Sequence, residues 1–97
     1  MTSPLWRWAS ENGVWYFISV DGAAADALQA TALMRRLESG RRAGFGAVRL
    51  TIRVGASAWQ TSAFPMREAG WSIPIASKFR KAEGLSEGDP VAAELRF

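Results

Sequence analysis

The chain contains no cysteine and no histidine. Without cysteine it can form neither a disulfide nor a thiolate nucleophile. Without histidine it lacks the commonest general base, the Ser-His nucleophile pair and the usual zinc ligand sets. No apolar run in it approaches the roughly 18 residues of a membrane-spanning helix. These absences exclude thiol and triad-type chemistry, and we expect no contact with a membrane.

The catalytic options that remain are a pair of carboxylates or a lysine with a lowered pKa. Glu87 and Asp89 are close together, but they belong to a turn that explains them structurally. Lys78 and Lys81 fall on a short helix of exposed character, and no base can be identified to activate Ser62. We therefore expect that the protein is not an enzyme and holds no metal or cofactor.

The chain has 97 residues, of which 48% are hydrophobic, and we expect a single domain over residues 1–97. Its net charge is +3 and its isoelectric point is about 10.2. The basic balance favours attraction to polyanions, or it reflects composition and solubility alone; both interpretations stay open. Residues 1–4 lack the basic-then-apolar order of a signal peptide, so we expect a cytoplasmic location.

The last third of the chain shows its architecture most clearly. Trp71, Ile73 and Ile75 alternate with less apolar residues, which predicts a strand with one buried face. Pro74 donates no ladder hydrogen bond, so this strand lies at an edge or ends there. The elements expected after it are a helix over residues 76–83, a left-handed Gly84 with Leu85 folding back in a Schellman ending, a turn around Gly88, and a closing strand over residues 91–97.

Upstream, apolar or alternating runs predict four more strands and a longer helix. The strands are expected over residues 5–8, 14–20, 48–54 and 59–64. The helix lies between Asp21 and Gly40, and its apolar side chains recur at helical spacing as one stripe of Ala27, Ala30, Leu33, Met34 and Leu37. We expect this stripe to pack on the rest of the protein. The fold class is therefore mainly β with two helices, in a small closed or double-split β-barrel.

The run I-P-I-x-x-x-F-R-K-A-x-G-L-x-x-G-D-x-V, residues 73–91, resembles the half-domain of the AbrB/MazE swapped-hairpin transcription factors and antitoxins. Over residues 14–97 the chain is more similar to a bacterial family of small barrels, Domain of Unknown Function 1905. The motifs that carry this similarity are Gly44-Phe45-Gly46, Trp59-x-Thr61-Ser62, Phe64-Pro65, Pro74, Arg80-Lys81, Gly84-Leu85 and Gly88-Asp89. The resemblance implies an AbrB-like barrel and no established activity, since DNA binding belongs to the more distant relatives.

The chain also contains an internal echo. Residues 15–28 and residues 71–85 both consist of an aromatic residue, an alternating strand, a short break and a helix. We expect two pseudo-repeated half-barrels fused in one chain. A monomer of this kind would do what an AbrB-type dimer does with two copies, and a homodimer stays open as well.

Aromatic residues are concentrated near the N-terminus. They could form a stacking platform for bases or for a ligand, or fill the interior of a small barrel, and we favour the interior. The residues concerned are Trp6, Trp8, Trp15, Tyr16 and Phe17.

Two binding hypotheses follow. In the first, an arginine-rich surface binds nucleic acid, because guanidinium groups match phosphate oxygens; the alternative is a plain solvated surface. The candidates are Arg35, Arg36, Arg41, Arg42, Arg49, Arg53, Lys78, Arg80 and Lys81. In the second, a small ligand or a peptide or protein partner binds at a barrel edge or mouth. Its candidates, which packing would also explain, are Trp59, Thr61, Ser62 and Trp71.

Overall fold

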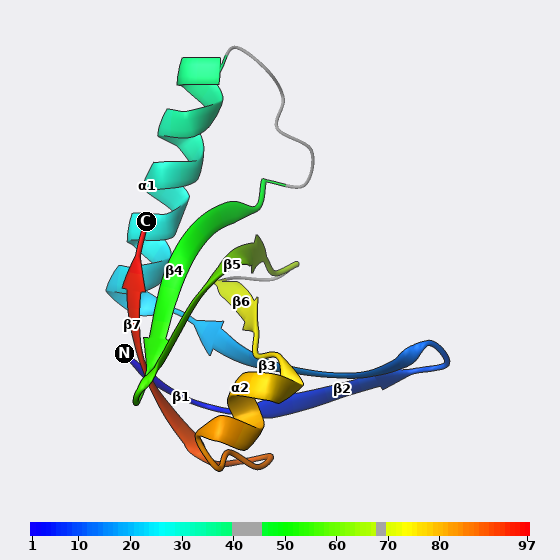
Figure 1. The fold of residues 1–97 in the computed structure, drawn as a ribbon. Helices are drawn as coiled ribbons and strands as arrows, with labels where there is room; N and C mark the ends of the chain where they lie inside the picture. Colours follow the sequence, from blue (N-terminus) through cyan, green and yellow to red (C-terminus); the bar gives the residue numbers. More distant parts are fainter. Residues whose placement is uncertain (40–45, 68–69) are drawn as a thin grey trace.

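The structure is a computed structural model, and it describes residues 1–39, 46–67 and 70–97 (Figure 1). In chain order its elements are β1 (Thr2–Pro4), β2 (Trp6–Ser10), β3 (Gly13–Val20), α1 (Gly22–Ser39), β4 (Val48–Val54), β5 (Ser57–Pro65), β6 (Trp71–Pro74), α2 (Ser77–Ala82) and β7 (Pro90–Arg96). Neither helix in the described part of the chain is long and apolar enough to cross a membrane.

The strands form a nearly closed barrel. They are hydrogen-bonded in the order β1-β7-β4-β5-β6-β3-β2, and every pair is antiparallel. β1 and β2 are consecutive, and the chain turns between them at Leu5, so β1 pairs with β7 while β2 pairs with β3. The first ten residues therefore join the two edges of the sheet. The expected class, mainly β with two helices in a small barrel, is confirmed.

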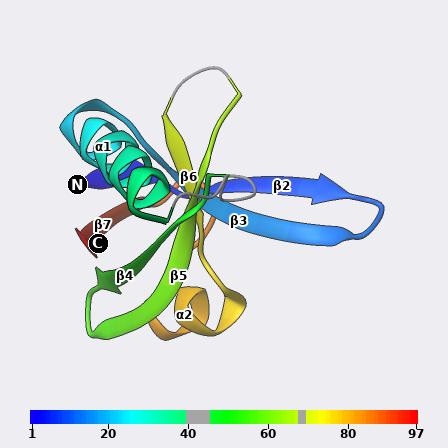
Figure 2. The same cartoon turned by 90° about the horizontal axis from the view of Figure 1, so that it is seen from above.

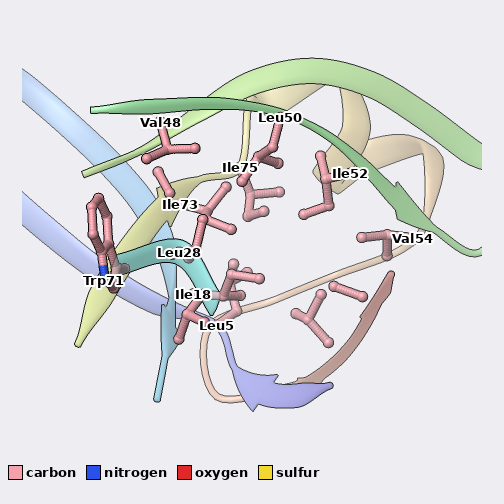
Figure 3. Packing of buried hydrophobic residues seen from close by; sticks show 14 residues of the cluster. Leu5, Ile18, Leu28, Val48, Leu50, Ile52, Val54, Trp71, Ile73 and Ile75 are labelled. Atoms are coloured by element: carbon pink, nitrogen blue, oxygen red, sulfur yellow. The ribbon is translucent and has the colours of Figure 1, made fainter. Parts of the chain in front are cut away.

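The turn at Leu5 is held from both sides. Its N–H donates to the carbonyl of Asp89 at 2.9 Å, and its carbonyl accepts from the N–H of Gly88 at 2.7 Å. Its side chain is 1% exposed and enters the core. It belongs there to one buried cluster with side chains from the inner faces of the strands, among them Ile18, Ile52 and Ile73 (Figure 3). The alternation expected for residues 48–54 is present, because Val48, Leu50, Ile52 and Val54 are all buried.

The strand pairing follows an internal symmetry. The unit β2-β3-α1-β4 corresponds to the unit β5-β6-α2-β7. β3 pairs with its counterpart β6, and β4 pairs with its counterpart β7, as an approximate twofold axis requires. This pairing matches the expected pseudo-repeat. The two halves differ most in their helices, since α1 has 18 residues and α2 has 6.

The turn chemistry expected for the last third is confirmed. Gly84 has a φ of +64° and Gly88 a φ of +88°, both in the left-handed region. The N–H of Leu85 donates to the carbonyl of Arg80 at 2.9 Å, and the N–H of Gly84 donates to that of Lys81 at 3.3 Å. These are the two hydrogen bonds of a Schellman motif.

The orientation expected for α1 is wrong. The residues that face the barrel are Leu28, which is 0% exposed, and the partly buried Ala24, Ala25 and Ala32. The stripe expected to pack there points outward instead: Leu33 is 54% exposed, Met34 57% and Leu37 70%, and Ala27 and Ala30 are exposed too. Small alanines face the barrel because they let the helix lie close to it, which the larger side chains would prevent.

The N-terminal aromatics do not all fill the barrel, which corrects our preferred interpretation of them. Hairpin β2–β3 extends away from the rest of the protein, because β3 pairs with β6 only over residues 17–20 (Figure 2). Trp6 stacks on Phe17 with ring centroids 4.8 Å apart, whereas Trp8 and Trp15 remain 50% and 40% exposed. The hairpin thus presents aromatic rings outside the core.

The closing role of Leu5 can be tested with two leucine-to-alanine variants. Leu5→Ala removes a fully buried side chain at the turn that joins the sheet edges, and we expect it to lower the free energy of unfolding by about 2–5 kcal/mol. Leu37→Ala makes the same chemical change at an exposed position and should alter it by less than about 0.5 kcal/mol. Urea denaturation at low protein concentration measures both. Equal midpoints for the two variants would contradict this account of closure.

Candidate functional site

A groove lies between the hairpin and α2. Its volume is about 380 Å³. We call it the aromatic groove, because four of its lining residues are the aromatics Trp15, Tyr16, Trp59 and Phe79. The remaining lining residues are Val14, Gln60, Thr61, Pro74, Ile75, Ala76, Ser77 and Arg80. They come from β3, β5 and the segment that runs from β6 into α2, so the groove exists only in the folded barrel.

Helix α2, which contributes part of the groove lining, is fixed against the barrel. The rings of Trp59 and Phe79 are stacked, with centroids 4.0 Å apart and an interplanar angle of 4°. At the end of the helix, the carboxylate of Glu83 accepts hydrogen bonds from the Ser57 hydroxyl at 2.7 Å and from the Ala56 N–H at 3.3 Å. A helix of six residues would not be stable alone, so these contacts to the β4–β5 hairpin hold it in place.

Arg80 is the cation of the groove. Its guanidinium lies over the ring of Tyr16, 3.8 Å from the centroid, which is a cation–π contact. The ring itself is positioned by the backbone, because the carbonyl of Tyr16 accepts a hydrogen bond from Ile75 at 2.8 Å. Within the described part of the chain, Nε of Arg80 is buried and has no hydrogen-bond partner, and Arg80 forms no ion pair.

This combination suits one kind of ligand. Aromatic rings offer flat faces on which another flat ring can stack. The Arg80 side chain lines the groove and forms no ion pair among the described residues, so its positive charge can act on an anion bound there. The best acceptor for a guanidinium edge is a carboxylate or a phosphate. The groove therefore offers stacking and anion recognition side by side.

The ligand-binding candidates from the sequence are only partly brought together. Trp59 and Thr61 line the groove, but Ser62 does not. Trp71 is 3% exposed and belongs to the core, which corrects its inclusion among ligand contacts. The sequence reasoning missed Phe79 as a groove residue and treated Tyr16 mainly as core. The sequence does carry a signal for Tyr16, since this residue belongs to the N-terminal aromatic cluster, which could also form a stacking platform.

Six of the nine nucleic-acid candidates form two groups, and the other three lie outside both. Arg49 and Arg53 are exposed on the outer face of β4, and Arg35 donates from Nη1 to the carbonyl of Arg49 at 3.1 Å. Arg96 of β7 pairs in register with Thr51 of β4 and so lies between them. We call Arg35, Arg49, Arg53 and Arg96 the basic face. It contains one acid, Glu94, whose carboxylate is 3.3 Å from Arg96.

The second group lies on α2. Lys78, Arg80 and Lys81 belong to this helix, which in Figure 1 lies at the opposite end of the barrel from the last turn of α1. Arg36 is exposed on that last turn. Arg41 and Arg42 lie outside the described residues. The nine candidates thus do not form one surface. No group of acids in the described ranges is placed to hold a metal ion.

Comparison with known proteins identifies the family. The model of the family described as Domain of unknown function (DUF1905) matches residues 2–95. No curated protein and no solved structure matches the chain. The match covers nearly the whole barrel, including both halves of the pseudo-repeat. The chain therefore belongs to the DUF1905 family.

Proposed function

We propose that this protein is a binding module without a catalytic step, and that its ligand is a flat aromatic group that carries a negative charge. The ring stacks in the aromatic groove, and the anionic group accepts hydrogen bonds from Arg80. The observation that carries this proposal is the side chain of Arg80, which lines a groove with four aromatic residues and forms no ion pair among the described residues.

The groove has the size and character of a site for a small ligand. Its volume of about 380 Å³ lies at the lower end of the range typical of such sites, roughly 300–1,000 Å³. Its walls are held by the protein's own contacts, because Trp59 and Phe79 stack on each other. The cation–π contact with Tyr16 also holds the guanidinium, so little side-chain freedom remains to be lost on binding.

Matched probes separate stacking from charge. Indole-3-acetate and tryptamine share one ring but differ in the sign of their charge, and adenosine monophosphate and adenosine differ by a phosphate. We expect the two anions to shift the indole N–H signals of Trp15 and Trp59 in NMR titrations. Tryptamine should not do so, because its ammonium group meets the Arg80 guanidinium. Adenosine should bind more weakly than its phosphate.

Two variants locate the binding. Arg80→Ala should weaken anion binding by about tenfold or more, as expected for loss of a charge-assisted hydrogen bond. Lys81→Ala removes a positive charge from an exposed position of the same helix outside the groove lining, and should leave the affinity within about twofold. Absence of any shift at Trp15 and Trp59 with both anions at millimolar concentration would contradict the proposal.

Nucleic acid is the second candidate ligand, and the basic face favours it. Arg35, Arg49 and Arg53 lie on neighbouring elements and are exposed. Duplex DNA would contact this face through phosphates, in the manner implied by the more distant resemblance to AbrB-type proteins. Arginine-rich faces of this size also serve solubility alone, so the salt dependence of binding decides the matter.

Fluorescence anisotropy with a labelled duplex tests this second candidate. If the basic face binds DNA, Arg49→Ala combined with Arg53→Ala should lower the affinity and make the salt dependence shallower by about two phosphate contacts. The control replaces Arg7 and Arg67, which are exposed on other segments and carry the same total charge. A loss of affinity that is equal in both double variants would point to net charge and exclude a specific face.

A further inference from the structure

The outward face of α1 has a regular apolar pattern. Its exposed apolar residues at positions 23, 27, 30, 34 and 37 are separated by steps of four, three, four and three residues. This is the a/d spacing of a helix that packs against another helix. We call this set the outer stripe; its members are Ala23, Ala27, Ala30, Met34 and Leu37. Leu33 flanks it and is also exposed.

The described part of the barrel does not account for the outer stripe. The corresponding helix in the other half, α2, makes its connection with 6 residues, whereas α1 uses 18. The side chains of α1 that reach the core all lie in its first two thirds, ending at Ala32. Beyond this point the helix continues with Met34 and Leu37, which are 57% and 70% exposed. Exposed side chains of this size at regular spacing indicate an interface.

We propose that α1 pairs with α1 of a second copy of this chain, in antiparallel orientation about a twofold axis. An isologous interface brings one surface against itself, so the stripe must be complementary to its own reversed copy. The outer stripe meets this condition in side-chain size. Alanines occupy its N-terminal half, and Met34 and Leu37 occupy its C-terminal half. Antiparallel pairing sets Ala30 opposite Met34 and Ala27 opposite Leu37, so that each layer combines a small residue with a large one.

The helix dipoles also favour the antiparallel arrangement, because in it the two dipoles oppose each other. The arginines of the C-terminal half take no part in this contact, since Arg35 turns to the barrel, where its Nη1 donates to the carbonyl of Arg49. A parallel pair would bring Met34 and Leu37 against their own copies and leave the alanine layers underfilled.

The expected dimer is weak. A helix of 18 residues is about 27 Å long, and two such helices crossing along one stripe bury an area at or below the low end for stable protein interfaces, about 1,200 Å². The exchange between monomer and dimer should therefore depend on protein concentration. This inference does not rest on the aromatic groove, which lies with α2.

Sedimentation velocity over a range of about 10 µM to 1 mM tests the association. The native protein should shift from monomer toward dimer across this range. Leu37→Glu, alone or with Met34→Glu, should remain a monomer throughout, because it places charge in the apolar layers. Trp8→Glu is the matched control, since Trp8 is 50% exposed on the hairpin and should not affect the dimer.

Two outcomes would overturn the inference. One is a native protein that stays monomeric throughout the range. The other is a dimer that Trp8→Glu dissociates and Leu37→Glu does not, which would place the interface on the hairpin. Circular dichroism confirms that each variant is folded, and because all the altered side chains are exposed, no variant removes part of the core.

Single cysteines test the orientation, and the absence of native cysteine makes each thiol unique. In the antiparallel pair the two copies of residue 37 lie about 15 Å apart along the helices, which is beyond the reach of a disulfide. Leu37→Cys alone should therefore not cross-link under mild oxidation. An equimolar mixture with Ala27→Cys should give the mixed disulfide. Efficient cross-linking of Leu37→Cys with itself would indicate a parallel pair and contradict the proposed geometry.

Discussion

Closure of the barrel by the N-terminal strand is the constraint on which the other features depend. Because the chain turns at Leu5, one continuous segment pairs with β7 on one side and with β3 on the other. β2 continues beside β3 into the free hairpin, which leaves the sheet where the pairing of β3 with β6 ends at Phe17. The same β3–β6 pairing places the β3 residue Tyr16 beside the segment that enters α2, where its carbonyl binds the N–H of Ile75. The groove forms there, with β5 paired to β6 on the other side.

Under the proposed function, the Arg80 guanidinium is the group that binds the anion of the ligand, and the fold holds it in place. It lies over the ring of Tyr16, and α2 is anchored to the barrel through Phe79 and Glu83. In the other half of the pseudo-repeat, the corresponding helix is longer and turns its alanines toward the barrel.

The sequence predicts where the helices and strands lie better than it predicts what each of them packs against. Alternation over residues 48–54 defines β4, and Gly84 and Gly88 adopt the left-handed conformations that their turns require. These features depend on local physics. The periodicity of α1 correctly indicates an apolar face, but periodicity does not say what covers that face, and the alanines on the opposite face pack on the barrel instead.

The candidate site shows the same limit, because the sequence pattern does not say which residues come together in the groove. Trp59 and Trp71 both stand in alternating strands, and their sequence patterns alone do not separate them. The register of β5 and β6 decides that one lines the groove while the other is buried. In the sequence, Arg80 cannot be distinguished from the other arginines, because its contact with Tyr16 joins residues 64 positions apart in the chain. A contact of this kind depends on the pairing of β3 with β6 and has no local signature.

The most direct test of the central claim is a set of NMR signals, those of the Arg80 guanidinium. The account predicts that its terminal N–H signals move downfield and exchange more slowly with solvent when adenosine monophosphate or indole-3-acetate is added, because these N–H groups gain a charged acceptor. Guanidinium signals that stay unchanged while the anion binds elsewhere would contradict the account.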